Sequence, residues 1–191
     1  MNMLLNFPSN VQYFSFVNYN RSQPGNDVES YYSEHHVRWA AFKSLPIDLS
    51  QLWVNMSGSG NNNLKYGIRW KWYETPVMCS VLKNSHLFFA LNFHLFEFAP
   101  QQNATFLTQI EYVYNLKIFP KQLKNRLYLS GFADQNLEGN GSFKSKWVHE
   151  HQIGFKLYKS WYAVAEFRVN QYLPFGYKGW GFGIEYLANF L

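Results

Sequence analysis

Hydrophobic and polar residues alternate along most of this chain with a period of two, the pattern of a β-strand with two different faces. The clearest stretch is residues 64–73. One face carries Leu64, Tyr66, Ile68, Trp70 and Trp72, and the other carries Lys65, Gly67, Arg69, Lys71 and Tyr73. Wound as a helix, this stretch would scatter its charges around the axis and show no apolar stripe. The pattern therefore predicts a strand here.

The same pattern predicts about ten strands along the chain. They lie at residues 10–20, 34–43, 49–56, 64–73, 86–98, 104–118, 126–133, 147–158, 161–170 and 178–191. Polar and glycine-containing stretches at residues 21–30, 57–63 and 134–146 indicate loops, and residues 159–160 indicate a tight turn. Residues 74–85 hold Pro76 and fit either a short strand or a turn. No segment gives a convincing helix pattern.

The lengths of the predicted strands help to decide between a membrane barrel and a soluble β-fold. Many keep their alternation for about ten residues, whereas a strand in a globular protein has about five or six. A tilted strand needs about nine to eleven residues to cross a bilayer. Long loops at residues 21–30 and 134–146 and tight links near Pro46 and Ser160 fall on opposite sides of the predicted sheet, which is typical of outer-membrane barrels. The connections at residues 74–85 and 100–103 do not follow this alternation and count against the predicted strand number. The pattern thus favours a membrane β-barrel over a soluble sandwich or jelly roll.

Composition agrees with a protein rich in β-structure and low in charge. Aromatic residues make up 20% of the 191 residues and charged residues 15%, below the roughly 25% of a typical soluble domain. No stretch reaches about 18 apolar residues, so a transmembrane helix is not expected. The net charge of +5 fits either simple solubility or attraction to an anionic surface such as phosphorylated lipid.

Two features of the sequence bear on where the protein resides. Cys79 is the single cysteine, so an intrachain disulfide is not possible and the redox compartment stays open. Residues 1–8 contain an apolar patch but no basic region and no small-residue cleavage site. They do not read as a signal peptide, and for an exported protein we expect the leader to be missing from this sequence.

Taken together, the dyad repeats at residues 64–73, 86–98, 104–118 and 161–170 and the C-terminal GWGFGIEYLANF resemble a Gram-negative outer-membrane β-barrel. The resemblance is to an architecture, spans most of the chain and names no specific family. It implies one all-β domain over residues 1–191, an antiparallel up-and-down transmembrane barrel of about ten strands, with eight to twelve open. The implied location is the outer membrane. The implied partners are the lipid bilayer with its lipopolysaccharide, and other envelope proteins as a further option, with no nucleic acid and no cofactor.

In such a barrel the polar strand faces would line the lumen. The expected charge network consists of Arg38, Lys65, Arg69, Lys71, Glu111, Glu150, Glu166, Arg168 and Glu185. A barrel of eight to ten strands has a narrow interior that side chains largely fill. Isolated charges there cost several kcal/mol to desolvate, so we expect paired charges that hold the barrel rigid. A narrow solute channel guided by opposed charges is the alternative.

The other strand faces would meet lipid. The expected lipid-facing girdle consists of Trp70, Trp72, Trp161, Trp180, Phe182, Tyr186 and Phe190. If the barrel closes, the last strand should pair with the strand at residues 10–20. We therefore expect a structural or partner-anchoring barrel, or a narrow channel, with a charged and largely filled lumen.

Candidate chemistry is sparse in this sequence. His149 and His151 share a strand face, as two metal ligands can, but no third ligand of matching spacing is visible, so no metal site is assigned. A lipid-acting hydrolase at the outer membrane is a second hypothesis. Its candidates are Ser130, Ser142, Ser145, Ser160 and His94. No serine motif such as Gly-x-Ser-x-Gly frames any of them, so no catalytic residue is assigned.

A third hypothesis is a secreted carbohydrate-binding sandwich. Its sugar-stacking residues would be Trp53, Trp70, Trp72, Trp147, Trp161 and Trp180. Most of these tryptophans alternate in phase with leucine, isoleucine and phenylalanine, which suits a girdle or a core better than exposed sugar-binding loops.

Overall fold

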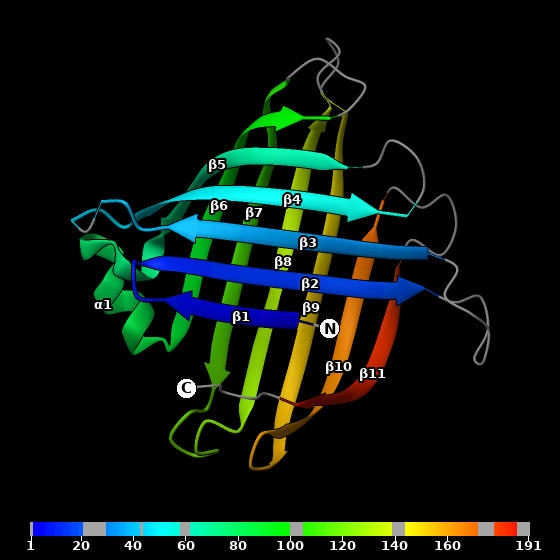
Figure 1. The fold of residues 1–191 in the computed structure, drawn as a ribbon. Coiled ribbons are helices and arrows are strands. Elements are labelled where there is room, and N and C mark those ends of the chain that lie inside the picture. The colour runs from blue at the N-terminus through cyan, green and yellow to red at the C-terminus, as the bar shows by residue number, and fades with distance from the viewer. Residues whose placement is uncertain are drawn as a thin grey trace. The chain divides into compact units, whose positions relative to one another are not determined.

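The structure is a computed structural model that describes residues 2–20, 30–42, 44–57, 62–99, 105–138, 144–171 and 178–186. Eleven strands form one antiparallel up-and-down sheet in which each strand pairs with its neighbours in sequence (Figure 1). The strands are β1 (Asn2–Phe7), β2 (Val11–Asn20), β3 (Ser30–Trp39), β4 (Ile47–Met56), β5 (Asn63–Lys71), β6 (Leu87–Phe98), β7 (Thr105–Ile118), β8 (Leu127–Glu138), β9 (Lys144–Tyr158), β10 (Trp161–Asn170) and β11 (Lys178–Tyr186). The predicted all-β, antiparallel up-and-down fold is confirmed.

The first strand was not predicted from the sequence. β1 pairs with β2 over its whole length, from Asn2 opposite Phe16 to Phe7 opposite Val11. Its residues, NMLLNF, place apolar side chains next to one another instead of alternating. The pairing partner, and not a local pattern, makes this segment a strand.

The two ends of the predicted loop at residues 134–146 belong to strands instead. β8 continues to Glu138 and β9 begins at Lys144, and the two strands pair from Leu127 opposite Phe155 to Glu138 opposite Lys144. Residues 134–138 and 144–146 are polar except for Leu137, and this composition indicated a loop. Ladder hydrogen bonds between two adjacent strands need no apolar side chains, so polar residues can continue a strand that is already paired.

A helical segment connects β5 and β6, where the sequence indicated no convincing helix. It consists of the 3₁₀-helix η1 (Trp72–Glu74) and α1 (Pro76–Asn84). Pro76 occupies the start of α1, where its missing N–H and fixed φ cost nothing. Because β5 ends at Lys71, Trp72 does not belong to a strand. Its ring packs against Phe89 with centroids 5.3 Å apart. Within the residues that the structure describes, no helix is long and apolar enough to span a membrane.

The chain divides into two compact units. Unit 1 comprises Met1–Trp70 and Asn92–Gln109, and unit 2 comprises Lys71–Leu91 and Ile110–Leu191. Unit 1 contains β1 to β4 and nearly all of β5; unit 2 contains α1 and β8 to β11. The single domain expected over residues 1–191 remains a prediction.

The last strand does not have the partner that the sequence suggested. β11 pairs with β10, from Lys178 opposite Val169 to Tyr186 opposite Trp161. The expected partner, β2, is hydrogen-bonded to β1 on one side and to β3 on the other. Pairing of the last strand with residues 10–20 is therefore wrong, because β1 occupies that edge.

Candidate functional site

The side chains that this sheet buries are mostly polar. Among the described residues, fifteen polar or charged residues are buried, against seven hydrophobic ones. The polar set is Ser15, Ser33, His36, Arg38, Asp48, Ser50, Lys65, Arg69, Lys71, Asn92, His94, Thr108, Gln109, Glu111 and Asp134. Charged residues are almost never fully buried in proteins unless they are paired. The candidate site is therefore this set of buried polar side chains and their partners.

In unit 1 the buried centre is the guanidinium of Arg69. Its Nε donates to Asp48 Oδ2 at 2.8 Å, and its Nη2 also contacts that oxygen. Its Nη1 donates to Gln12 Oε1 at 2.9 Å. Asp48 and Arg69 are directly opposite each other on β4 and β5, so the antiparallel register brings this acid and base together. Arg69 thus links β5 to β4 and β2 through buried hydrogen bonds.

A row of side chains along β3 extends this network. Arg38 Nη1 donates to the same Gln12 Oε1 at 3.4 Å, and Arg38 Nη2 lies 3.3 Å from His36 Nδ1. His36 Nε2 is 3.0 Å from Glu34 Oε2. Glu34, His36 and Arg38 are alternate residues of β3, and Gln12 is opposite Arg38 on β2. The four side chains therefore share one face of the sheet. We call the connected set Glu34, His36, Arg38, Gln12, Arg69 and Asp48 the arginine network.

Lys65 forms a second buried contact set in unit 1. Its Nζ donates to Gln109 Oε1 at 2.7 Å and lies 3.7 Å from Glu97 Oε2. Asn63 Nδ2 donates to Glu97 Oε1 at 2.7 Å. Lys65 is thereby held by an amide oxygen and a carboxylate, as a buried ammonium group requires.

In unit 2 the polar face carries three further pairs. Lys71 Nζ lies 2.6 Å from Glu74 Oε2, and Arg168 Nε lies 3.4 Å from Glu150 Oε2. The Tyr128 hydroxyl donates to Glu185 Oε2 and accepts from Gln152 Nε2 at 2.5 Å. The ring of Tyr128 is also contacted by the Lys117 ammonium group, 5.0 Å from its centroid. The contacts around Tyr128 thus join β7, β8, β9 and β11.

The predicted lumen residues are thus buried or half-buried. Arg38, Lys65, Arg69, Lys71 and Glu111 are buried; Glu150, Glu166, Arg168 and Glu185 are half-buried. The sequence did not single out the partners Gln12, Asp48, Glu97, Gln109 and Tyr128. The alternation places Gln109 on the polar face of its predicted strand, but Asp48 lies in a predicted connection and Glu97 breaks the alternation of residues 86–98. Only the structure shows which cation each partner meets.

Five of the seven predicted girdle residues lie on strand faces opposite the predicted lumen residues: Trp70, Trp161, Trp180, Phe182 and Tyr186. Trp72 does not, because it lies in η1. Trp161, Trp180, Phe182 and Tyr186 are exposed, and Phe182 has 81% of its surface accessible. The rings of Trp161 and Tyr186 pack on each other with centroids 4.8 Å apart, and the ring of Trp180 packs on Phe167 with centroids 5.0 Å apart. Trp70 is half-buried, and Phe190 lies outside the described residues.

The histidine pair lies on the same face of β9 as the exposed side chains of Ile153 and Phe155. The rings of His149 and His151 are 5.0 Å apart between centroids, and the Tyr114 hydroxyl is 2.9 Å from His151 Nδ1. Within the described ranges, no group of three or more histidine, cysteine or acidic residues is arranged to hold a metal ion. The arrangement adds no metal site.

The described serine hydrolase candidates belong to different elements of the chain. Ser130 is on β8 opposite Gln152, and His94 is a fully buried residue of β6 whose carbonyl accepts a hydrogen bond from the Thr108 hydroxyl at 3.4 Å. Ser160 sits in the turn after β9, Ser145 is in β9, and Ser142 lies outside the described residues. No catalytic role is assigned to any of them.

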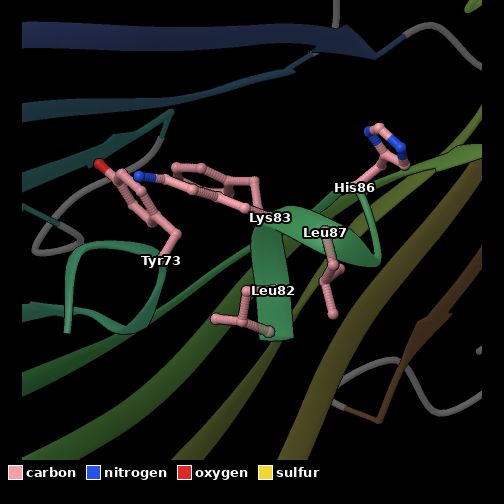
Figure 2. Close-up of a pocket in the computed structure, with 6 residues that line it drawn as sticks. Tyr73, Leu82, Lys83, His86 and Leu87 are labelled. Atoms are coloured by element: carbon pink, nitrogen blue, oxygen red, sulfur yellow. The ribbon is translucent and has the colours of Figure 1, made fainter. Parts of the chain in front are cut away.

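A shallow apolar pocket lies beside α1 in unit 2. Its lining is Tyr73, Leu82, Lys83, His86, Leu87 and Phe88. Figure 2 shows the Lys83 side chain reaching toward Tyr73, whose ring packs on Phe88 with centroids 4.4 Å apart. The pocket is open and almost wholly apolar, so it lacks the convergent polar groups of a small-molecule site.

Comparisons of the chain with known protein families, with curated proteins and with solved structures find no match.

Proposed function

We propose that this protein is an integral β-barrel of an outer membrane, with an interior filled by hydrogen-bonded polar side chains. One observation carries the proposal: the same strands bury their charged residues and expose their large apolar ones. On β3, His36 and Arg38 are 3% and 9% exposed, whereas Val37 and Trp39 are 39% and 49% exposed. A strand of a soluble sheet would show the reverse order.

Lipid as the outer solvent explains this inversion. In water, long rows of exposed tryptophan, phenylalanine and isoleucine would form apolar patches of the kind that drive association. In a bilayer, the same rows face the apolar lipid chains, and the polar strand faces line the interior, as in known membrane barrels. β11 illustrates the outer row, because Trp180, Phe182, Ile184 and Tyr186 are all exposed.

A membrane location also requires that the sheet leave no unpaired edge in the hydrocarbon. β1 and β11 each have one strand partner in the ladder, and we propose that their remaining edges close the barrel. Because eleven antiparallel strands alternate in direction, β1 and β11 run in the same sense along the ladder. Direct pairing between them would make a parallel seam.

The polar networks support a rigid scaffold more than an open channel. Arg69 is bonded to both Asp48 and Gln12, and Lys65 to Gln109, so these cations are held by protein groups. Hydrogen-bonded networks of this kind fix neighbouring strands relative to one another. A scaffold or partner-anchoring barrel is therefore the proposed role, embedded among membrane lipids and lipopolysaccharide.

Extraction and gel mobility test the membrane barrel. The full chain should require detergent for solubility, and unheated samples should migrate differently from boiled samples in SDS gels, because a closed barrel resists SDS until it is heated. A protein that stays monomeric in buffer without detergent contradicts the proposal.

Planar-bilayer recording separates the scaffold from the channel. Reconstituted protein should give no steady single-channel conductance, since the networks fill the interior. Reproducible unitary currents would overturn the filled-scaffold role and favour a narrow channel in the same barrel.

A further inference from the structure

The positive charge of this chain is concentrated at one end of unit 2. This end comprises the connections after β5, β7 and β9, some strand residues that flank them, and the end of β11. The corresponding residues are 72–86, 117–127, 156–162 and 184–186. These ranges hold seven lysines and arginines and two acidic residues, whereas the remaining chain holds ten of each. The whole excess of +5 in the chain is therefore located in these ranges.

Direct contacts join these segments side by side. The amide of Lys117 donates to the His86 carbonyl at 3.1 Å, and the amide of Lys156 donates to the Arg126 carbonyl at 2.8 Å. Arg126 Nη2 donates in turn to the Lys156 carbonyl at 2.7 Å. Five basic residues of this end are exposed, and we call them the basic rim: Lys83, Lys121, Lys124, Arg126 and Lys159.

The two acidic residues of this end contact side chains that do not belong to the rim, and the five cations of the rim outnumber them. The Glu74 carboxylate lies 2.6 Å from Lys71 Nζ, and Glu185 accepts the hydrogen bond of the Tyr128 hydroxyl. The rim therefore presents a positive field to whatever lies beyond it.

Exposed aromatic and aliphatic side chains alternate with the charges of the rim. Phe119 is 64% exposed and Tyr158 is 66% exposed, and Leu157 is exposed beside them. The Lys159 ammonium group lies 5.2 Å from the Tyr158 ring centroid. Amphipathic aromatics and lysines with apolar stems are enriched where a protein meets the headgroup layer of a membrane. The phosphates of a nucleic acid would pair with the cations, but they would not bury an exposed leucine.

The backbone of the rim gives an independent reason to assign a role to these side chains. Phe119, Lys124 and Lys159 have φ of 45°, 49° and 46°. This left-handed conformation favours glycine or asparagine and strains a longer side chain. Strain of this kind concentrates where side chains have a function. The turns therefore keep lysine and phenylalanine at positions that glycine would fill with less strain.

We propose that the basic rim binds the phosphate-bearing headgroups of anionic phospholipids, and so marks the end of the barrel that sits in an anionic leaflet. The inference rests on the proposed membrane barrel and adds a lipid preference and an orientation to it. Lysine and arginine side chains near an anionic membrane surface each contribute up to about fivefold in binding.

Tryptophan quenching by brominated lipids measures this preference. The full chain is reconstituted in phosphatidylcholine vesicles that contain a minor fraction of brominated phosphatidylglycerol, or of brominated phosphatidylcholine as the reference. The expected preference for phosphatidylglycerol is about fivefold or more, and it should shrink in high salt because exposed charges are screened. Lys121→Gln/Lys124→Gln should lower the preference to less than about twofold.

Matched variants separate the rim from net charge and from misfolding. Lys146→Gln/Lys178→Gln removes the same charge from the starts of β9 and β11 and should leave the preference unchanged. Lys124→Gly/Lys159→Gly relieves the left-handed strain, so it should fold at least as stably as the parent and still lose the preference. A preference that survives in both rim variants overturns the inference.

Competition identifies the occupant. Soluble glycerol phosphate or a short DNA duplex, added at ionic strength matched with chloride, should not change the quenching by brominated phosphatidylglycerol. Displacement by either one would indicate a phosphate or nucleic-acid site and overturn the lipid assignment.

Failure of the barrel and failure of the rim give different results. A chain that inserts in phosphatidylcholine but shows no phosphatidylglycerol preference supports the proposed barrel and contradicts the proposed lipid binding by the rim. A chain that needs no detergent and floats only with vesicles containing phosphatidylglycerol loses the barrel and keeps an anionic-lipid surface at the rim.

Discussion

The Tyr128 hydroxyl on β8 donates a hydrogen bond to Glu185 Oε2 on β11, across the two strands that lie between them in the sheet. Gln152 on β9 donates to the same hydroxyl and lies 3.4 Å from the same carboxylate oxygen. The ring of Tyr128 can reach so far because it lies over Gly154, where no side chain blocks it. One buried tyrosine thus ties together three strands of unit 2.

Removing either partner of this hydrogen bond should destabilise the protein. Tyr128→Phe keeps the ring but deprives the Glu185 carboxylate of a donor, which should lower the free energy of unfolding by about 1–3 kcal/mol. Urea unfolding of the reconstituted protein measures the change. In a double-mutant cycle with Glu185→Gln, the two losses should be coupled by about 0.5–3 kcal/mol. Strictly additive losses would show that the two groups do not interact.

A methyl group at Gly154 should collide with the tyrosine ring. A Cβ built there lies 2.2 Å from Tyr128 Cζ and 2.3 Å from Cε1, so Gly154→Ala should cost about 1–3 kcal/mol of stability through overpacking. Gly179→Ala is the matched control, because a Cβ there has no atom within 4 Å. The melting temperature should fall for the first variant and stay nearly unchanged for the second. Equal effects would contradict the close approach of Tyr128.

The ion pair of Arg69 and Asp48 should be sensitive to loss of one partner. Asp48 is 2% exposed, so Arg69→Met removes the arginine that pairs with a buried carboxylate, at a cost of about 3–5 kcal/mol. Replacing both residues, as Arg69→Met/Asp48→Leu, should recover most of that loss. Glu74→Gln serves as the comparison, since its carboxyl group is 45% exposed and its pair with Lys71 should contribute at most about 1 kcal/mol. If the double variant is less stable than Arg69→Met, the pair does not behave as a buried ion pair.

A charge on the outer face distinguishes lipid from water as the surrounding solvent. Phe182 is in the middle of β11 and 81% exposed. In a bilayer, Phe182→Lys should cost about 2–4 kcal/mol, because a lysine at mid-membrane depth is poorly solvated. In water, the same change at an exposed position should be nearly neutral. Stability in reconstituted vesicles measures the difference.

Phe119→Lys provides the internal control for that test. Phe119 is 64% exposed but lies in the connection between β7 and β8, where a membrane barrel would meet headgroups and water. Its substitution should change stability little. Similar small effects of both substitutions would argue against a bilayer around β11.

Much of the strand arrangement could be predicted from the sequence, because a period of two is a local property of neighbouring side chains. The polar set Lys65, Arg69 and Lys71 and the apolar set Trp180, Phe182 and Tyr186 could be separated by counting alone. The helix α1 was missed because its nine residues are too few for a persuasive pattern, although Pro76 marks its start. β1 was missed because its apolar residues do not alternate.

The sequence by itself determined the class of fold and the face to which each residue of a regular strand belongs. Only the tertiary structure decided the partners. Asp48 meets Arg69 through the register of β4 and β5, and Tyr128 meets Glu185 across a separation of 57 residues. Alternation repeats identically at every second residue and so carries no information on register or on the neighbouring strand. Those are selected by contacts between segments far apart in the chain, such as β8 and β11, which the hydrogen bond of Tyr128 and Glu185 joins.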